Sequence, residues 1–537
     1  MTPIESRIDT AQAAYAEQRQ GMLALIERLR QLEQRTRDAS AKAKAAFDKR
    51  GALLPRERVA RLLDPGAPFL ELGNMAGYCA EGETPETSVP GGGQITGIGF
   101  VCGVRCMVAA SDSAIAAGAY VDAGSKKLLR AQEIALENRL PFIHLVESAG
   151  ANLRTYRVER FIRGGGLFYN LARLSAAGLP VITVVHGPST AGGAYMPGLS
   201  DYVVMVRRRA RAFLAGPPLL LAATGEIATD EELGGADMHA RTSGLAEYVG
   251  EDDAHAIAIA RDIVAALDWA APAPARVGKP PVLDPDELAG VMPLDVKKPV
   301  DMQQVIARIV DESAWLAFKP DYGVSTLCGH ARIEGHGVGI ISNNGPIDPA
   351  GATKAAQFIQ LCNQSATPIV FMQNTTGFIV GRMSEEAGMI KHGAKMIQAL
   401  SNSRVPHVTL YCGASFGAGN YGMCGQAFRP CMSFSWPNAK TAVMGGEQAA
   451  MTMDIVARQQ AGRSGKPVDE EALARQRAQI IANFERQASA FITSGLMLDD
   501  AIIDPRSTRA VLGFVLAMAR EAPLRRGHPV QFGVARF

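Results

Sequence analysis

The fold of this chain is indicated by PVITVVHGPSTAGGAY at residues 180–195 and PHVTLYCGASFGAGNY at residues 406–421. Each begins with an apolar run after a proline and ends in a glycine-rich segment, which is typical of a buried strand followed by a helix. The two stretches are 226 residues apart, and the upstream glycines Gly150 and Gly377 are 227 residues apart. A shift of one residue over this distance indicates an internal duplication. The chain is therefore predicted to contain two copies of one domain.

Each copy alternates apolar strands with amphipathic helical sequence. In the first copy the predicted strands include residues 104–112, 141–150 and 180–187, and helical sequence separates them. This alternation is typical of right-handed βαβ units in a mostly parallel sheet. The predicted fold class is therefore α/β, with two tandem domains and additional helices at the N-terminus.

The predicted domain organisation follows from local composition. Residues 1–50 carry apolar side chains at helical spacing and form a predicted N-terminal helical segment. Residues 51–270 and 296–537 hold the two copies. The intervening residues 271–295 are rich in proline, which favours a linker.

The charge balance argues against several partners. Lys and Arg total 55 and Asp and Glu total 53, without a long block of like charge, so neither nucleic acid nor a membrane surface is a predicted partner. Two uncharged stretches, residues 174–200 and 405–428, are rich in glycine and fit buried strands better than membrane spans. The first residues lack an apolar core, which argues against a secretory signal or transit peptide and favours a cytoplasmic protein.

The cysteine pattern argues against a metal site. Eight cysteines are scattered along the chain without a C-x-x-C pair or a neighbouring histidine cluster. Structural zinc sites need closely spaced ligand pairs, so neither a metal site nor a disulfide framework is predicted.

The two glycine-rich turns carry the predicted chemistry. A strand that ends in glycines and opens a helix directs free backbone N–H groups and the positive end of the helix dipole at one point. Such donors can stabilise an oxyanion. The predicted donors are the amides of Gly192 and Gly193 in the first copy and of Ala418 and Gly419 in the second. Two such sites suggest that one reaction stabilises two oxyanions.

Three alternative functions compete for these turns. The G-x-G-x-x-G pattern at residues 417–422 matches a dinucleotide fingerprint, but no Asp or Glu occurs from residue 387 to residue 446, so this function is rejected. The G-x-S-x-G pattern around Ser415 matches a nucleophile elbow, and a serine hydrolase acting on a thioester stays as an alternative that would need His528. A hydratase or isomerase could use Glu147 as a base, although a structural carboxylate fits the residue as well.

Several segments resemble a known family over almost the whole chain, from about residue 20 onward. The segments that carry the resemblance are GALLPRERVARLLDPGAPFLELG (51–73), AGGAY (191–195), FLAGPPLL (213–220), ATGEIA (223–228), GAGNYGMCG (417–425), VMGGEQAA (443–450) and DDAIIDPRSTRAVLG (499–513). They are similar to the carboxyltransferase β subunits of biotin-dependent acyl-CoA carboxylases, in particular to the branch that acts on 3-methylcrotonyl-CoA and geranyl-CoA. The resemblance implies two crotonase-like (ClpP/crotonase) domains in each subunit, in agreement with the duplication.

The resemblance also implies a mechanism and partners. Carboxybiotin, delivered by a biotin carboxylase and biotin carrier α subunit, would release CO₂ while its ureido oxygen lies at Ala418 and Gly419. The biotin nitrogen would take the γ-proton of the acyl-CoA, and the dienolate oxygen would lie at Gly192 and Gly193. The family's site forms between the N-domain of one subunit and the C-domain of another, in a β hexamer with six α chains. This chain has no Ala-Met-Lys-Met attachment motif, so biotin is expected as a co-substrate on the partner, with no covalently bound cofactor and no metal.

The substrate is predicted from the glycine triplet 164–166, which lies in the segment RGGGLF at residues 163–168. Where methylcrotonyl-type subunits carry a phenylalanine, this chain aligns Gly164, followed by Gly165. Glycine would leave room for a longer acyl chain, so geranyl-CoA is the predicted substrate and 3-methylcrotonyl-CoA the alternative. The other interpretation is that the glycines merely begin a helix.

Further candidate residues would bind the coenzyme A part of the substrate. Lys127 and Lys354 are 227 residues apart, each near the start of a predicted helix, and they are candidates for the phosphates. The resemblance marks the segment 325–354, including Asn343 and Asn344, as an acyl-CoA-binding stretch.

Overall fold

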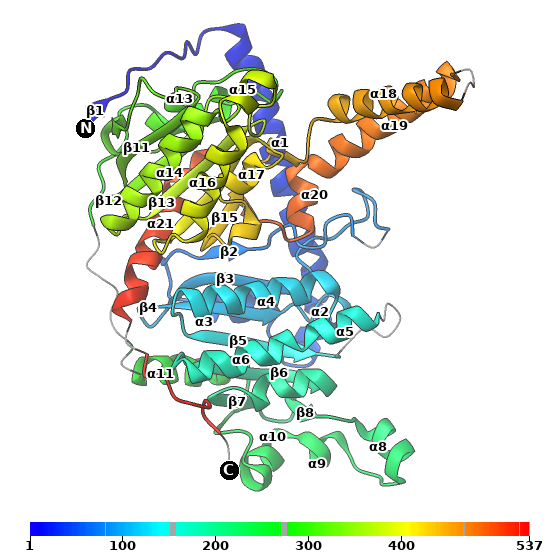
Figure 1. Ribbon diagram of the computed structural model, residues 1–537. Helices are drawn as coiled ribbons and strands as arrows, with labels where there is room; N and C mark the ends of the chain where they lie inside the picture. Colours follow the sequence, from blue (N-terminus) through cyan, green and yellow to red (C-terminus); the bar gives the residue numbers. More distant parts are fainter. Residues whose placement is uncertain are drawn as a thin grey trace. The chain divides into compact units, whose positions relative to one another are not determined.

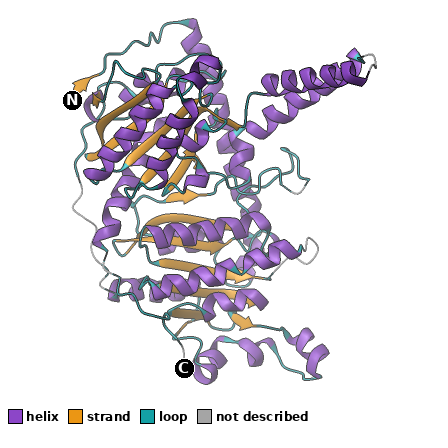
Figure 2. Ribbon diagram, viewed as in Figure 1, coloured by secondary structure: helices purple, strands orange, loops and turns teal. Residues whose placement is uncertain are grey.

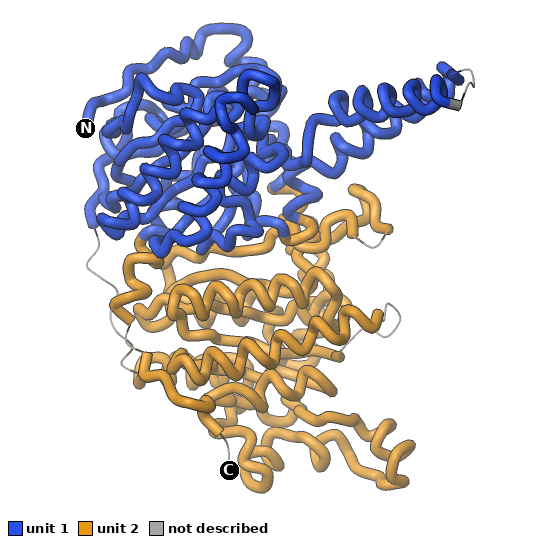
Figure 3. Tube along the Cα trace, viewed as in Figure 1, with its two compact units in different colours: residues 1–29, 276–494, 498–516 blue, residues 30–275, 495–497, 517–537 orange. Residues whose placement is uncertain are grey.

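The computed structural model describes residues 1–80, 82–150, 157–267, 269, 276–464, 468–525 and 527–535. The chain divides into two compact units, which Figure 3 colours separately. Unit 1 comprises residues 1–29, 276–494 and 498–516. Unit 2 comprises residues 30–275, 495–497 and 517–537. Each unit contains one sheet flanked by helices, so the predicted α/β class is confirmed (Figures 1 and 2).

The sheet of unit 2 runs in the order β2-β3-β4-β5-β6-β7-β9, with β8 paired to β6. The β2-β3-β4 part is antiparallel, and the strands from β4 onward pair in parallel, as βαβ crossovers require. The strands are β2 Leu70–Leu72, β3 Gln94–Val101, β4 Val104–Ser111, β5 Phe142–Ser148, β6 Val181–Thr190, β7 Tyr202–Val206, β8 Arg211–Phe213 and β9 Tyr248–Gly250.

Helices cover both faces of this sheet (Figure 1). Ile143 and Leu145 of β5 are buried in one apolar cluster with residues of α3 and α11. Side chains alternate along a strand, so α4 and α6, which pack on one another, cover the other face. The helices of unit 2 are α2 Lys44–Lys49, α3 Pro55–Leu62, α4 Asp122–Glu137, α5 Val158–Gly164, α6 Gly166–Ala176, α7 Tyr195–Gly198, α8 Pro217–Thr224, α9 Asp230–Gly234, α10 Ala236–Met238 and α11 Asp253–Ala266.

The sheet of unit 1 repeats this plan in the order β1-β10-β11-β12-β13-β14-β15-β17, with β16 paired to β14. Its strands are β1 Thr2–Pro3, β10 Ala314–Ala317, β11 Thr326–Ile333, β12 His336–Asn343, β13 Ile369–Thr375, β14 His407–Phe416, β15 Met432–Ser435, β16 Lys440–Ala442 and β17 Ala501–Ile502. Its helices are α12 Leu288–Val291, α13 Met302–Ala307, α14 Pro349–Gln364, α15 Arg382–Glu386, α16 Met389–Ser401, α17 Gly419–Gly422, α18 Gly446–Ser464 and α19 Glu470–Ala488.

Three helices have residues in both units. They are α1 Ala13–Ala41, α20 Ala490–Gly495 and α21 Thr508–Glu521. The apolar positions of α1 that the sequence spacing singles out are buried, among them Met22, Ile26 and Leu29. The C-terminal end of α21 belongs to unit 2, where its last residue, Glu521, forms a buried ion pair with Arg105.

The predicted linker 271–295 is described only from residue 276, because residues 271–275 lie outside the described part. Residues 276–295 belong to unit 1 and contain α12, whose Leu288 and Val291 are buried. We keep 51–270 and 296–537 as proposed domain boundaries. None of the helices in the described ranges combines the length and the apolar character that a membrane crossing requires.

Candidate active site

The glycine-rich turns occupy equivalent places in the two units. In unit 2, β6 ends at Thr190 and the short helix Ala191–Ala194 leads into α7. In unit 1, β14 ends at Phe416 and α17 begins at Gly419. The duplication predicted from the sequence is thus visible as the same strand-turn-helix sequence in each sheet.

The four predicted donor residues have matching environments. Gly192 and Ala418 are exposed, whereas Gly193 and Gly419 are buried. Within the described ranges, none of these four amides donates a hydrogen bond outside its own short helix. Free amides at a helix start are the donors that an oxyanion would accept from. The structure therefore gives all four residues the local geometry of their predicted role, and the role itself stays a prediction.

Aromatic side chains flank the turn of unit 2. The rings of Phe168 and Tyr195 lie 5.4 Å apart between centroids. A Cβ placed on Gly192 would lie 3.5 Å from Phe168 Cζ, so the end of this ring borders the turn. Phe168 is not among the site residues predicted from the sequence. Its position in the RGGGLF segment, four residues after Gly164, is the signal that could have found it.

Gly164 lies one helical turn before Phe168. It ends α5, Gly165 joins α5 to α6 with helical dihedral angles, and the two helices are therefore almost continuous. Among the described residues, a Cβ placed on Gly164 would meet no atom within 4 Å. As far as these residues show, the space beside Gly164 is open, and it lies on the same helical face as the ring that borders the turn.

Ser415 is not placed as a nucleophile. Its side chain is fully buried, and its hydroxyl donates to Gln373 Oε1 at 2.5 Å and accepts from Asn420 Nδ2 at 2.7 Å. Neither partner is a base, so neither activates the hydroxyl as a hydrolase would require. The hydrogen bonds instead fix the end of β14 before its turn.

Glu147 is buried in an ion pair. Its Oε2 accepts from Arg58 Nη1 at 2.6 Å and from Ser113 Oγ at 2.8 Å. Burial alone would raise the pKa of Glu147, but the charge and hydrogen bond of Arg58 outweigh it and lower the pKa. The side chain lies on the α3 face of the sheet, whereas the turn borders α6. A charged carboxylate on that face is not placed to act as the base of a hydratase.

The paired lysines are buried and bind backbone carbonyls. Lys127 Nζ donates to Gln94 O at 2.6 Å and to Gly91 O at 3.3 Å, and burial lowers its pKa to about 8. Lys354 Nζ donates to Tyr322 O at 2.9 Å and to Gly323 O at 3.4 Å. Each lysine therefore holds the loop before the first strand of its hairpin. This placement does not favour the predicted contact with coenzyme A phosphates, because the ammonium groups are already occupied away from solvent.

The two asparagines of the predicted acyl-CoA stretch differ in environment. Asn343 ends β12, is fully buried, and neither polar atom of its side chain has a hydrogen-bond partner among the described residues. Asn344 is exposed, and its Oδ1 accepts from the amide of Met302 at 2.8 Å. Asn343 is thus the residue with unused hydrogen-bonding capacity, and its role stays a prediction.

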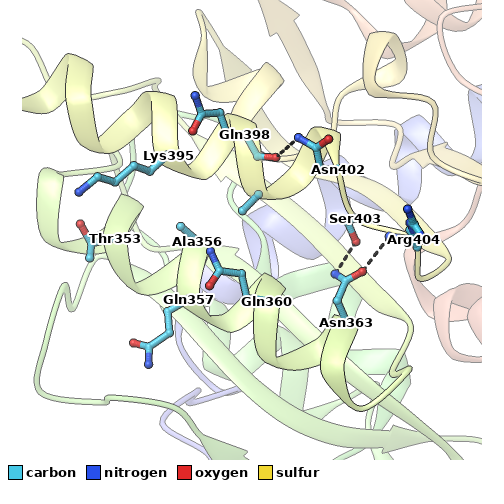
Figure 4. Close-up of a pocket in the computed structure, with 11 residues that line it drawn as sticks. Thr353, Ala356, Gln357, Gln360, Asn363, Lys395, Gln398, Asn402, Ser403 and Arg404 are labelled. Atoms are coloured by element: carbon cyan, nitrogen blue, oxygen red, sulfur yellow. Dashed lines mark hydrogen bonds between the residues drawn. The ribbon is translucent and has the colours of Figure 1, made fainter.

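A separate cavity of about 750 Å³ lies between α14 and α16 in unit 1 (Figure 4). Carboxamides and two cations, Lys395 and Arg404, line it. Part of the lining is engaged internally, since Asn363 Nδ2 donates to Ser403 Oγ at 2.7 Å. None of the predicted site residues lines this cavity, so it is not the site built by the glycine-rich turns. The described residues also contain no group of three or more His, Cys, Asp or Glu side chains suited to a metal ion.

The duplicated fold and its paired turns are those of a carboxyltransferase. The chain belongs to the carboxyl transferase domain family, which matches residues 47–531. A probable biotin-dependent acyl-coenzyme A carboxylase beta2 subunit of Mycobacterium tuberculosis is 50% identical over 490 residues, covering 91% of each chain. The probable mitochondrial methylcrotonoyl-CoA carboxylase beta chain of Drosophila melanogaster is 43% identical, covering 99% of this chain and 95% of that protein.

A solved structure is also similar over the whole chain. The beta subunit of the geranyl-CoA carboxylase of P. aeruginosa is 51% identical, with a TM-score of 0.93 and complete coverage of both chains. The resemblance seen in the motifs is confirmed: the chain is an enzyme with a crotonase-like fold, a carboxyltransferase of the biotin-dependent acyl-CoA carboxylases.

Proposed function

We propose that this chain moves a carboxyl group from carboxybiotin to the γ-carbon of geranyl-CoA. The observation that carries the choice of substrate is the open space at Gly164, one helical turn from the ring that borders the turn of unit 2. A glycine there leaves room for a long branched acyl chain beside the predicted oxyanion donors. The similarity to the geranyl-CoA carboxylase beta subunit supports the same substrate.

The proposed roles of the turns follow from where negative charge develops. The amides of Gly192 and Gly193 stabilise the thioester dienolate oxygen, and those of Ala418 and Gly419 stabilise the ureido oxygen of biotin. The N–C bond of carboxybiotin breaks to release CO₂, the freed nitrogen takes the γ-proton, and the γ-carbon forms a bond to CO₂. No protein carboxylate is needed as a base, which fits the placement of Glu147.

The proposed partner is a biotin carboxylase and biotin carrier α subunit. The family of this chain is biotin-dependent, and the sequence has no biotin-attachment motif. We propose that the chain acts as a β hexamer with six α chains. Each site would combine the unit 2 turn of one β subunit with the unit 1 turn of another.

A second acceptor, 3-methylcrotonyl-CoA, has its own support. Proteins named methylcrotonoyl-CoA carboxylase beta chain share 43% to 45% of their residues with this chain. The shorter acyl group would occupy the same site and leave the space at Gly164 unfilled.

The proposal is tested by running the transfer backwards on the purified chain. Free biotin is supplied with either 3-methylglutaconyl-CoA or carboxygeranyl-CoA, and loss of the carboxyl group is followed. Biotin-dependent loss with preference for the longer compound is the expected result. Failure of both compounds in an intact oligomer would refute transfer to either proposed acceptor, and preference for the shorter one would leave only the second acceptor.

A further inference from the structure

The turn of unit 2 comes after an irregularity in the sheet. Val146 pairs with Val185 and Ser148 pairs with Ser189, so a single residue of β5, Glu147, lies opposite three residues of β6. A bulge of this kind bends a strand and redirects the residues beyond it. The direction in which β6 delivers its amides therefore depends on how the three bulged residues are held.

Glu147 fills the bulge from the neighbouring strand. A Cβ placed on Gly187, the central bulged residue, would lie 2.7 Å from Glu147 Cγ and 2.8 Å from its Oε1. The glutamate side chain thus occupies the space that a side chain at Gly187 would need. Close packing of this kind transmits a displacement of one strand to the other.

Unit 1 contains the same arrangement with an uncharged residue. Gln373 pairs with Tyr411 and Thr375 with Ser415, so Asn374 lies opposite three residues of β14. A Cβ placed on the central one, Gly413, would lie 2.5 Å from Asn374 Oδ1. Both copies therefore place a carboxyl or carboxamide against a bulge glycine a few residues before the turn. Two occurrences in one chain argue that the contact serves the feature that the copies share, which is the turn.

The glutamate is itself fixed by a buried charge cluster in unit 2. Arg58 of α3 binds Glu147 at 2.6 Å and Asp253 at 3.4 Å. Asp253 Oδ1 lies 2.7 Å from the Nδ1 of His186, the first bulged residue. Burial, together with Arg58, lowers the pKa of His186 to about 4, so the ring is neutral at pH 7 and donates to the carboxylate. One cluster thus holds two consecutive bulged residues, His186 through Asp253 and Gly187 through Glu147.

We propose that Glu147 is a positioning residue for the oxyanion turn of unit 2, acting through Gly187, and that Asn374 does the same in unit 1. This inference rests on the proposed carboxyl transfer, since it assigns a reason for the geometry of the donors. Glu147 touches no reacting atom. It keeps the bulge in the shape that points the amides of Gly192 and Gly193 at the developing charge.

The test uses a compensating pair of substitutions in the full-length oligomer. Glu147→Asp keeps the charge but withdraws the carboxylate from Gly187, and Gly187→Ala forces a methyl group against the glutamate. Each is expected to lower kcat of the reverse transfer about 10-fold or more, because a small misplacement of catalytic donors has effects of that size. The KM values for biotin and for the carboxylated acyl-CoA are expected to stay within about twofold, since the turn stabilises the transition state more than the bound substrates.

The double variant Glu147→Asp with Gly187→Ala provides the decisive readout. The shorter side chain makes room for the added methyl group, so kcat is expected to recover above that of either single variant. A matched control is Glu521→Asp, which shortens the partner of Arg105 in another buried ion pair of unit 2. It is expected to lower the melting temperature and leave kcat within about twofold.

Three outcomes would overturn the inference. Wild-type kcat in a folded Glu147→Asp oligomer would overturn it, as would an equal loss of kcat in Glu521→Asp at a comparable loss of melting temperature. If the unit 2 variants do not assemble, Asn374→Ala tests the equivalent contact without leaving a charge unpaired, and wild-type kcat there overturns the proposal. Absence of transfer in the wild-type chain is a different result, because it would refute the proposed function instead.

Discussion

Ala191 and Gly417 adopt the same left-handed backbone conformation at equivalent positions of the two turns, with φ of 54° and 57°. Glycine reaches this region freely, whereas an alanine there carries strain of about 1–2 kcal/mol. The two copies thus share the backbone conformation of the turn, although alanine, which stands at this position in the first copy, disfavours it. Strain of this kind at a proposed donor site is expected where the surrounding structure imposes the conformation.

We expect Gly417→Ala to fold and to retain the unit 1 turn, because Ala191 shows that the conformation accepts a methyl group. The free energy of unfolding should fall by about 1–2 kcal/mol. Denaturant unfolding of the two proteins measures this difference. Gly377→Ala is the control, since its φ of 115° is outside the region that alanine populates, and its loss should be larger. Equal losses in the two variants would contradict the prediction.

The buried donors should differ in their tolerance of a side chain. A Cβ on Gly419 would lie 2.7 Å from the backbone Cα of Gly377, whereas one on Gly193 would lie 3.4 Å from the hydroxyl of Ser189, which is an ordinary van der Waals contact. Gly419→Ala is therefore expected to lower the transfer rate about 10-fold or more, and Gly193→Ala to retain most of it. Steady-state rates of the reverse transfer decide the comparison. A reversed order would show that backbone crowding does not limit these turns.

Ser415→Ala separates carboxyl transfer from hydrolysis. The hydroxyl links the buried Gln373 to the half-buried Asn420, and its removal leaves both amides partly unsatisfied, so the free energy of unfolding should fall by about 1–3 kcal/mol. Carboxyl transfer at a temperature where the variant is folded should remain close to the wild-type rate. Complete loss of activity in a folded variant would instead support a nucleophilic serine.

Gly164→Phe should change the choice of substrate. A benzyl group would enter the open space beside Phe168 and exclude a long acyl chain, so kcat/KM with the geranyl compound should fall about 10-fold or more relative to the methylcrotonyl compound. The control is Gly165→Ala, whose Cβ would lie 3.4 Å from Ile162 O, at the joint between the helices. An equal loss on both compounds in Gly164→Phe would refute the pocket assignment.

Asp499 should make the stability of the protein depend on pH. Its burial in unit 1, with a contribution from Asp500, raises its pKa from 3.8 to about 7, although Ser435 donates to it. A raised pKa means that the folded state keeps a proton which the unfolded state has lost, so stability is lost as the pH rises from about 4 to about 7. The slope approaches about 1.4 kcal/mol per pH unit. Asp499→Asn should flatten this dependence in unfolding experiments, and an unchanged profile would contradict the assignment.

The fold was predictable because its signals repeat. The glycines of the turns recur at a fixed spacing, and each set follows an apolar run. The duplication and the strand-turn-helix arrangement can therefore be predicted from the sequence alone. The ion-pair partner of Glu147 could not be predicted from the sequence, because Arg58 is 89 residues away and no local pattern connects the two residues. Only the packing of α3 on the sheet brings them together.

The two lysines show what residue type alone leaves open. A lysine near a helix start in a protein that binds phosphates suggests an anion site, because most lysines are exposed. Lys127 and Lys354 are instead buried and hold backbone carbonyls in both copies. Sequence spacing identified them as equivalent, but it could not tell whether their charges face solvent or the protein interior.

The return of the C-terminus to unit 2 has a consequence for synthesis. Arg105 is synthesised 416 residues before Glu521, its buried partner, and the unit 1 residues 276–494 and 498–516 are all made in between. A nascent unit 2 therefore lacks the carboxylate of this buried ion pair until α21 has been made. Unit 2 is thus completed only after residues 276–494 and 498–516 of unit 1 have been made, so a chain truncated before α21 lacks this buried ion pair.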